Sequence, residues 1–200
     1  MTDAGAAGAA AAPPDTGQRA RILAAALSLV SELGSAGTSM RRLAAACGLN
    51  VATIYHYFPS KAALLRALVE EQHYGERLAA DDPPTDPDLA PRERFHTFFA
   101  WVAERATQEE TVLRLLVGEG LRGNDVAQSS ARDLVAALDA ALVAWLGAGF
   151  PELGAPGGTG VEVAAGLVRQ ALLAHIVEHL TTGTTDPAAA AEDLAVVLFP

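Results

Sequence analysis

Two histidines and a glutamate near the C-terminus stand at a spacing that could hold a catalytic metal. His175, Glu178 and His179 spell H-x-x-E-H, an inverted form of a zinc-protease pattern. Residues four apart on a helix share a face, so both imidazoles could bind one ion. The rest of the sequence offers no clear third ligand. We therefore expect partly buried histidines, with no metal, no cofactor and no catalytic residue. The alternatives are a zinc hydrolase and a regulatory or adventitious metal held by His175 and His179.

A glycine-rich run in the middle of the chain has the letters of a dinucleotide fingerprint. Residues 118–123 read G-x-G-x-x-G after an apolar stretch. That chemistry requires a preceding strand within a parallel sheet. No segment alternates with period two for long, and residues 111–117 are equally compatible with a helix. The run is therefore predicted to be a helix end followed by a turn.

Two short helices joined by a tight turn are predicted over residues 40–47 and 51–57. Thr38 or Ser39 can cap the first and Asn50 the second, and Gly48 stops the first. This is the helix-turn-helix pattern, whose second helix enters the major groove of DNA. The residues expected to fix the angle between the helices are Leu43, Ala44, Cys47, Leu49 and Ile54. Cys47, the only cysteine, is interpreted as a small packing residue, with a thiol sensor as the alternative.

Three consecutive rings favour an exposed second helix. Neighbouring side chains on a helix point about 100° apart, so Tyr55, His56 and Tyr57 cannot all face one core. At least one of them is expected at the surface. The alternative is a helical hairpin that serves only as core.

This segment closely resembles the DNA-binding domain of the tetracycline-repressor (TetR) family of bacterial regulators. The resemblance runs from Arg21 to Leu68 and rests on S-M-R-R-L-A at 39–44, G-L at 48–49, T-I-Y-H-Y-F at 53–58 and P-S-K at 59–61. Val51 and Tyr57 differ from residue types frequent at those positions in the family, so the operator sequence is not predicted. The DNA-contacting residues that the resemblance implies are Ser39, Arg41, Arg42, Val51, Ala52, Thr53, Tyr55, His56, Tyr57 and Lys61.

The charge distribution agrees with DNA binding at one end of the chain. The net charge is −10, yet residues 18–66 carry six basic side chains against one acidic side chain. Residues 67–200 carry eight basic against 21 acidic side chains. A basic segment joined to an acidic remainder confines any phosphate-binding surface to the N-terminal part.

The hydrophobic pattern predicts an all-α protein of about nine helices. Residues 1–17, rich in Ala, Gly and Pro, are expected to form a disordered tail. Residues 18–66 form the helix-turn-helix domain, and residues 67–200 a helical effector-binding and dimerisation domain. No apolar run approaches the roughly 20 residues of a membrane span, so a cytoplasmic protein without membrane contact is expected. Further helices are predicted over 18–33, 61–79, 92–106, 109–117, 125–146, 161–180 and 188–199, with loops at 81–91 and 147–160.

The resemblance also implies the remaining partners. The family's regulators bind palindromic double-stranded operators as homodimers, usually as repressors, and a small effector releases them. Val161–Leu180 and Ala188–Phe199 would pair with their copies; ordinary core of a monomer is the alternative. A protein-binding helical scaffold is the remaining alternative function. The candidates for a pocket that takes an apolar effector, each of which could instead be core, are Phe95, Phe98, Phe99, Trp101, Arg105, Trp145 and His175.

Overall fold

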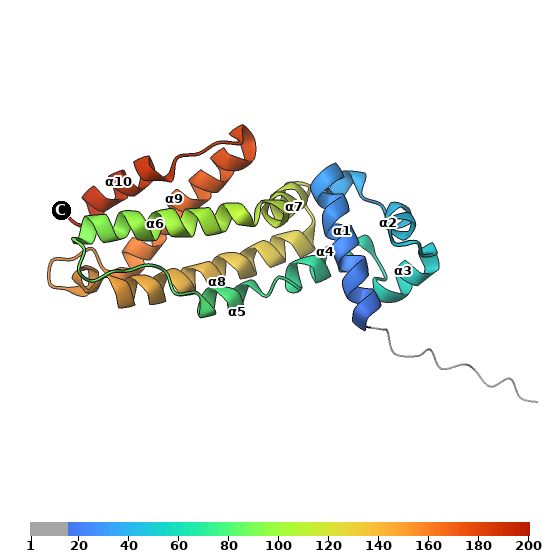
Figure 1. Cartoon of the computed structure of the whole chain (residues 1–200), viewed down its shortest axis with the longest axis horizontal. Coiled ribbons are helices and arrows are strands. Elements are labelled where there is room, and N and C mark those ends of the chain that lie inside the picture. Colours follow the sequence, from blue (N-terminus) through green and yellow to red (C-terminus); the bar gives the residue numbers. More distant parts are fainter. Residues whose placement is uncertain (1–15) are drawn as a thin grey trace, which may run out of the picture. The chain divides into compact units, whose positions relative to one another are not determined.

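The structure is a computed structural model that describes residues 16–200 (Figure 1). Those residues form ten α-helices and one short 3₁₀ helix, without a strand, which confirms the all-α prediction. The described part of the chain divides into two compact units after Leu64. The tail expected over 1–17 lies outside the described residues, except for Thr16 and Gly17, which belong to the first helix.

Three helices make up the N-terminal unit before the chain enters α4: α1 (Thr16–Gly37), α2 (Met40–Cys47) and α3 (Val51–Tyr57). Gly34 leaves helical geometry with φ of 67°, at the residue where the sequence predicts the end of the first helix. The side chains of Ile22, Leu43 and Ile54 are fully buried, one from each helix. These three side chains fix the helices against one another.

Residues 17–37 of α1 meet the length and hydropathy of a membrane-crossing helix, contrary to the expectation that no segment comes close. The match is weak, because the core helix of a globular domain passes the same test. Ile22, Leu23, Ala26 and Val30 are buried at helical spacing within the N-terminal unit. These four apolar residues of α1 therefore have partners inside the protein.

The helix predicted over 61–79 is in fact two helices, α4 (Lys61–Glu70) and α5 (Tyr74–Ala80). His73 lies between them with φ of 49°, the only non-glycine residue with positive φ in the described chain. A residue in this left-handed region interrupts the i→i+4 hydrogen bonds of a helix. The apolar spacing continues through the break, which explains why the sequence pattern did not reveal it.

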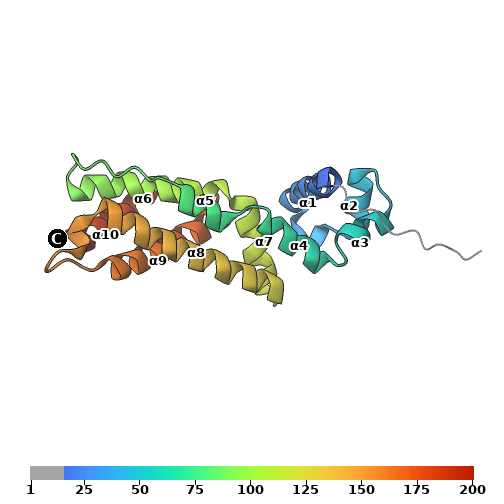
Figure 2. The ribbon, with the colours of Figure 1, turned by 90° about the horizontal axis from the view of Figure 1, so that it is seen from below.

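The C-terminal unit is a helical bundle built from α6 (Pro91–Gln108), α7 (Glu110–Leu121), α8 (Asp125–Gly149), α9 (Val161–Thr182) and α10 (Pro187–Leu198). α10 packs along α6, and α8 packs along both α9 and α5 (Figure 1, Figure 2). The loop expected over 147–160 is shorter, since α8 reaches Gly149 and a 3₁₀ turn covers Pro151–Gly154. The fully buried rings of Phe95, Phe98, Phe99 and Phe150 form the centre of the core.

The glycine-rich run 118–123 is a helix end, as predicted. α7 continues to Leu121, and Gly123 turns the chain with φ of 76°. No strand precedes it in the described chain, so the dinucleotide interpretation has no structural support.

Candidate nucleic-acid interface and ligand pocket

Side-chain caps hold the two helices of the helix-turn-helix in place. Ser39 accepts a hydrogen bond from the backbone N–H of Arg42 at 3.2 Å. Asn50 Oδ1 accepts from both the backbone N–H and the hydroxyl of Thr53, at 2.7 and 2.9 Å. Gly48, at φ 65° and ψ 30°, closes α2 in the left-handed conformation that glycine adopts without strain. These local bonds set the start of α3, the predicted recognition helix.

The outer side of α2 and α3 presents cationic and aromatic groups. Arg41 is exposed and has no protein partner among the described residues. Tyr55 is 48% exposed, which is unusual for so large a ring, and His56 beside it is also exposed. Ile54 faces the opposite way and is fully buried. Tyr55 and His56 are therefore free to contact a ligand, as the sequence indicated for at least one ring of the three.

Three of the predicted contact residues are bonded within the N-terminal unit. The Tyr57 hydroxyl donates to Gln18 Oε1 at 3.1 Å, and Lys61 Nζ donates to the Ser35 carbonyl at 2.5 Å. Arg42 Nη1 donates to the carbonyl of Gly37 at 2.6 Å. Tyr57, Arg42 and Lys61 thus brace the domain, whereas Ala52 is exposed and Val51 is partly exposed at the start of α3.

A small cavity of about 100 Å³ lies inside the C-terminal unit. Of the seven residues predicted for an effector pocket, Trp101, Arg105 and Trp145 line it. The two indole rings meet edge to face, with centroids 5.8 Å apart. Its apolar wall consists of Leu78, Val102, Ala106, Leu113, Leu134, Leu138, Leu172 and Ile176. Its polar rim, most of which the sequence interpretation missed, consists of Tyr74, Arg77, Asp81, Arg105 and Glu109.

The other four candidates do not line this cavity. Phe95, Phe98 and Phe99 are fully buried and pack against Phe150 and Phe199, so they act as core. His175 is buried and lies 3.2 Å from the Thr185 hydroxyl through Nε2. The spacing of the phenylalanines predicts one apolar helix face. It cannot distinguish a core from a pocket wall, because both require such a face.

Comparison with known proteins decides the family. The model of the bacterial regulatory proteins of the TetR family matches residues 22–68. The transcriptional regulator UidR of Escherichia coli K12, which is helix-turn-helix in type, is 41% identical over 51 residues. Residues 22–68 are a DNA-binding domain of the TetR family. The UidR match covers 26% of this chain and 26% of that protein, so it concerns the DNA-binding segment and leaves the rest of the protein's activity open.

Solved structures of regulators extend the likeness to the whole fold. Salmonella enterica GusR is 25% identical, covers 90% of this chain and 91% of its own, and has a TM-score of 0.61. Reduced E. coli NemR is 19% identical with a TM-score of 0.66 over 90% of this chain and 95% of its own. The multidrug-binding protein EbrR, solved with proflavin, is 22% identical with a TM-score of 0.63, over 90% and 99%. The likeness in fold therefore includes the C-terminal bundle.

The two histidines of the H-x-x-E-H pattern have separate partners among the described residues. His179 Nε2 lies 3.4 Å from Glu110 Oε2, while His175 bonds to Thr185. Burial, followed by the nearby His179, lowers the pKa of His175, and its Nε2 lies within hydrogen-bond distance of Thr185. No cluster of three metal-ligating side chains occurs within residues 16–200.

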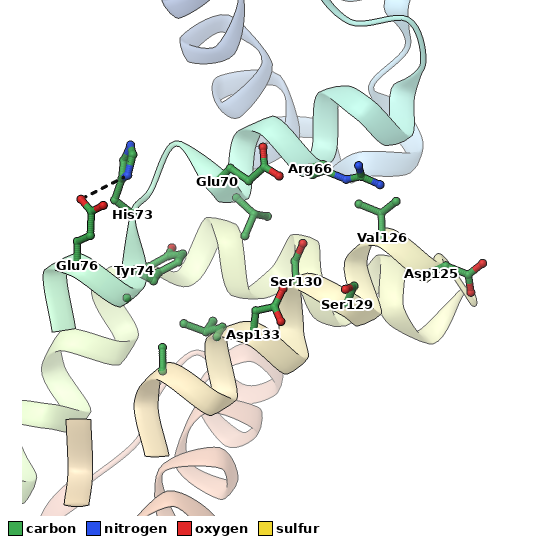
Figure 3. A pocket seen from close by; sticks show the side chains of 14 residues that line it. Arg66, Glu70, His73, Tyr74, Glu76, Asp125, Val126, Ser129, Ser130 and Asp133 are labelled. Atoms are coloured by element: carbon green, nitrogen blue, oxygen red, sulfur yellow. Dashed lines mark ion pairs between the residues drawn. The ribbon is translucent and has the colours of Figure 1, made fainter. Parts of the chain in front are cut away.

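A larger groove of about 630 Å³ lies between α4–α5 and α8 within the C-terminal unit (Figure 3). Glu70, Asp125 and Asp133 contribute carboxylates to its lining, and Arg66 the only guanidinium. His73 pairs with Glu76 at 3.6 Å at one end of the groove. Its lining is more polar than the largely apolar wall of the small cavity, and apolar walls with few polar groups are typical of effector sites. The small cavity is therefore the better candidate for a ligand pocket.

Apolar side chains remain exposed on the last two helices. Val163, Leu173 and Val177 on α9 are 57%, 38% and 55% exposed, at helical spacing. Val196 and Val197 on α10 are 48% and 59% exposed. Both terminal helices of the described chain therefore carry exposed apolar side chains.

Proposed function

We propose that the protein is a ligand-responsive transcriptional repressor that binds a palindromic operator as a homodimer in the cytoplasm. A small molecule in the pocket rimmed by α5 and α6 releases it from DNA. The observation that carries this proposal is the family's DNA-binding segment, with an exposed face on α2 and α3, joined in one chain to a helical unit that holds an internal pocket.

DNA binding uses the groups left free on α2 and α3. Arg41 supplies a positive charge without an internal partner, and Tyr55 and His56 offer hydrogen bonds beside it. Ala52 and Val51 can contact a thymine methyl, and Thr53 and Ser39 stand at the two helix starts. Tyr57, Arg42 and Lys61 hold the domain in shape and can still share their polar groups with phosphates.

A second copy completes the operator site. One recognition helix reads half a site, and a two-fold pair reads two halves about 34–36 Å apart, one turn of DNA. The exposed valines and Leu173 of α9 and α10 support pairing through Val161–Leu180 and Ala188–Phe199, as a four-helix bundle.

Release requires that the effector favour a conformation unable to bind both half-sites. α5 carries part of the pocket rim and continues, through three residues, into α4. Ligand that moves α5 therefore acts on the segment that enters the N-terminal unit. Shifting the population from mostly bound to mostly released takes about 5.5 kcal/mol of differential affinity.

Selection from a random duplex library tests the proposal. The full-length protein should enrich an inverted repeat with half-sites one turn apart, and its affinity should fall steeply with salt because phosphate contacts release counterions. Arg41→Ala should lose the enrichment. Arg132→Ala removes the same charge at an exposed position of α8 and should keep the enrichment. Failure to retard any duplex at low salt would contradict DNA binding and favour a protein-binding scaffold.

A further inference from the structure

The rim of the ligand pocket is built from two matching sets of side chains. α5 and its end supply Tyr74, Arg77 and Asp81; α6 and its end supply Trp101, Arg105 and Glu109. Each set runs aromatic, arginine, acid along the chain, at spacings of three or four residues. Such spacing places the three members of each set on one side of their helix.

The two sets join reciprocally across the pocket. Arg77 Nη2 donates to Glu109 Oε1 at 2.5 Å, and Arg105 Nη2 donates to both oxygens of Asp81 at 2.5 and 2.6 Å. Each guanidinium also lies over its own aromatic ring, 5.5 Å from the centroid of Tyr74 and 5.4 Å from that of Trp101. Both arginines are thereby held in place before any ligand arrives, which lowers the entropy cost of binding one.

Most of the hydrogen-bonding groups at the rim that have no partner in the described chain are donors. The oxygens of Asp81 and Glu109 each already accept a bond, from Arg105, Arg77 or the Tyr74 hydroxyl at 2.9 Å. Trp145 Nε1 is also used, since it donates to the Asp81 carbonyl at 3.2 Å. Each arginine, by contrast, bonds through a single nitrogen out of three, so most of its five N–H groups have no protein acceptor in the described chain.

The apolar part of the pocket limits the size of the ligand's body. Leucine, isoleucine and indole side chains surround about 100 Å³. This is of the same order as the roughly 150 Å³ apolar cavity that accepts a benzene ring. A single ring or a short branched chain fits such a space, with its polar group at the rim.

We propose that the effector is a small organic carboxylate, with a one-ring apolar body against Trp101 and Trp145 and its carboxylate on the unused N–H groups of Arg77 and Arg105. The planar guanidinium matches a carboxylate in a two-bond geometry that a neutral or cationic group cannot reproduce. An amine would find fewer unused partners, because both oxygens of Asp81 and of Glu109 already accept a hydrogen bond. This inference depends on the proposed function only in calling the ligand an effector.

Tryptophan fluorescence reads this pocket directly, because the chain's two tryptophans, Trp101 and Trp145, both line it. The full-length protein is titrated with phenylacetate, phenylacetamide and phenethylamine, which share a ring and differ in the charge of the end group. Phenylacetate should change the emission saturably and bind about tenfold or more tightly than either analogue, since charged hydrogen bonds add to the shared ring contacts. Equal or tighter binding of phenethylamine, or no binding of any of the three, would overturn the proposal.

Variants distinguish binding to the rim arginines from a general attraction to positive charge. Arg77→Gln and Arg105→Gln should each weaken phenylacetate about tenfold or more and leave phenylacetamide nearly unchanged. Arg132→Gln removes the same charge at an exposed position of α8 that does not line this pocket. It should bind phenylacetate like the unmodified protein. An equal loss in all three variants would mean attraction to net charge alone and would overturn the proposed site.

The same titration on the protein bound to its selected duplex distinguishes the two proposals. Release by phenethylamine but not by phenylacetate would leave the repressor function standing and reject the carboxylate. Tight phenylacetate binding in a protein that retards no duplex would keep the carboxylate site and reject the repressor.

Discussion

The hydroxyl of Tyr57 donates a hydrogen bond to Gln18 Oε1 at 3.1 Å, across 39 residues of sequence. It ties the last residue of the recognition helix α3 to the first turn of α1. The Tyr57 ring also packs beside His56 edge to face, with centroids 5.5 Å apart. A residue at which the family resemblance implies a DNA contact therefore has a structural bond as well.

Tyr57→Phe tests which of these roles dominates. The ring stays and only the bond to Gln18 is lost, so the free energy of unfolding should fall by about 1 kcal/mol. Chemical denaturation followed by circular dichroism measures it. DNA affinity should change less than in Tyr55→Ala, whose ring is exposed. A large loss of affinity in Tyr57→Phe with unchanged stability would show that the hydroxyl serves DNA rather than the domain.

Arg41→Ala should weaken operator binding without destabilising the protein. Its side chain is exposed and bonds to nothing in the described chain, so the loss is about 1–3 kcal/mol of binding free energy at the base or phosphate it contacts. Arg42→Ala should also lower stability, because Arg42 bonds to the Gly37 carbonyl. Fluorescence anisotropy with a labelled duplex, alongside thermal melts, separates the two effects. Equal operator affinity of Arg41→Ala and the unmodified protein would remove Arg41 from the interface.

Glu152→Gln should destabilise the C-terminal unit through Arg94. The Arg94 side chain is 5% exposed, lies 4.9 Å from the Phe150 ring centroid and bonds to Glu152 at 2.6 Å. Removing the partner of a buried cation lowers the free energy of unfolding by about 3–5 kcal/mol. Because Glu152 is itself 41% exposed, we expect a loss of about 2 kcal/mol. Glu76→Gln, at an 85% exposed acid, is the control and should stay within about 0.5 kcal/mol.

Acid should weaken the same contact. Burial opposes ionisation of Glu152, but its own backbone N–H and Arg94 outweigh it and lower the pKa of the carboxyl. A lowered pKa contributes stability that is present above the unfolded value of about 4.3 and is lost as the pH falls through the folded value. Denaturation of Glu152→Gln between pH 6 and 3 should therefore show a shallower acid loss than the unmodified protein; identical slopes would exclude this pair as a source of acid sensitivity.

His175 should give a second pH dependence, nearer neutrality. Burial and then the charge of His179 lower its pKa, against the opposing effects of Glu178 and Asp186. The unfolded chain takes up the proton at a pH of about 6.5 while the folded chain resists it, so stability should fall as the pH drops below that value. His175→Gln, which can still bond to Thr185, should flatten the stability profile between pH 7 and 5. An unchanged profile would assign that pH dependence to other groups.

Val177→Glu should disrupt the proposed homodimer. Val177 is 55% exposed on α9, and a charge there would be buried unpaired at a two-fold interface. Light scattering should report one chain in place of two, with loss of operator binding. Leu121→Glu is the matched control, an 85% exposed apolar residue on α7, and should stay dimeric. A dimeric Val177→Glu would place the interface elsewhere.

Local features were predictable because short segments determine them. Ser39, Gly48 and Asn50 specify the helix-turn-helix through bonds that span three or four residues, and the structure shows those caps. The break at His73 was not predictable, since residues 61–79 keep helical spacing through it. Nor was the core role of Phe95, Phe98 and Phe99, because a helix face shows that it is apolar but not what it meets.

The sequence by itself determined the family, the helical class and the position of the recognition helix, because caps, turns and periodicity act over a few residues. Only the tertiary structure decided that Arg77 meets Glu109 and that Arg105 meets Asp81, pairs that are 32 and 24 residues apart. Packing brings residues of α5 and α6 into the lining of one cavity, and no local pattern encodes which distant charge a flexible arginine will find there. The chemistry of the pocket is therefore a property of the assembled bundle.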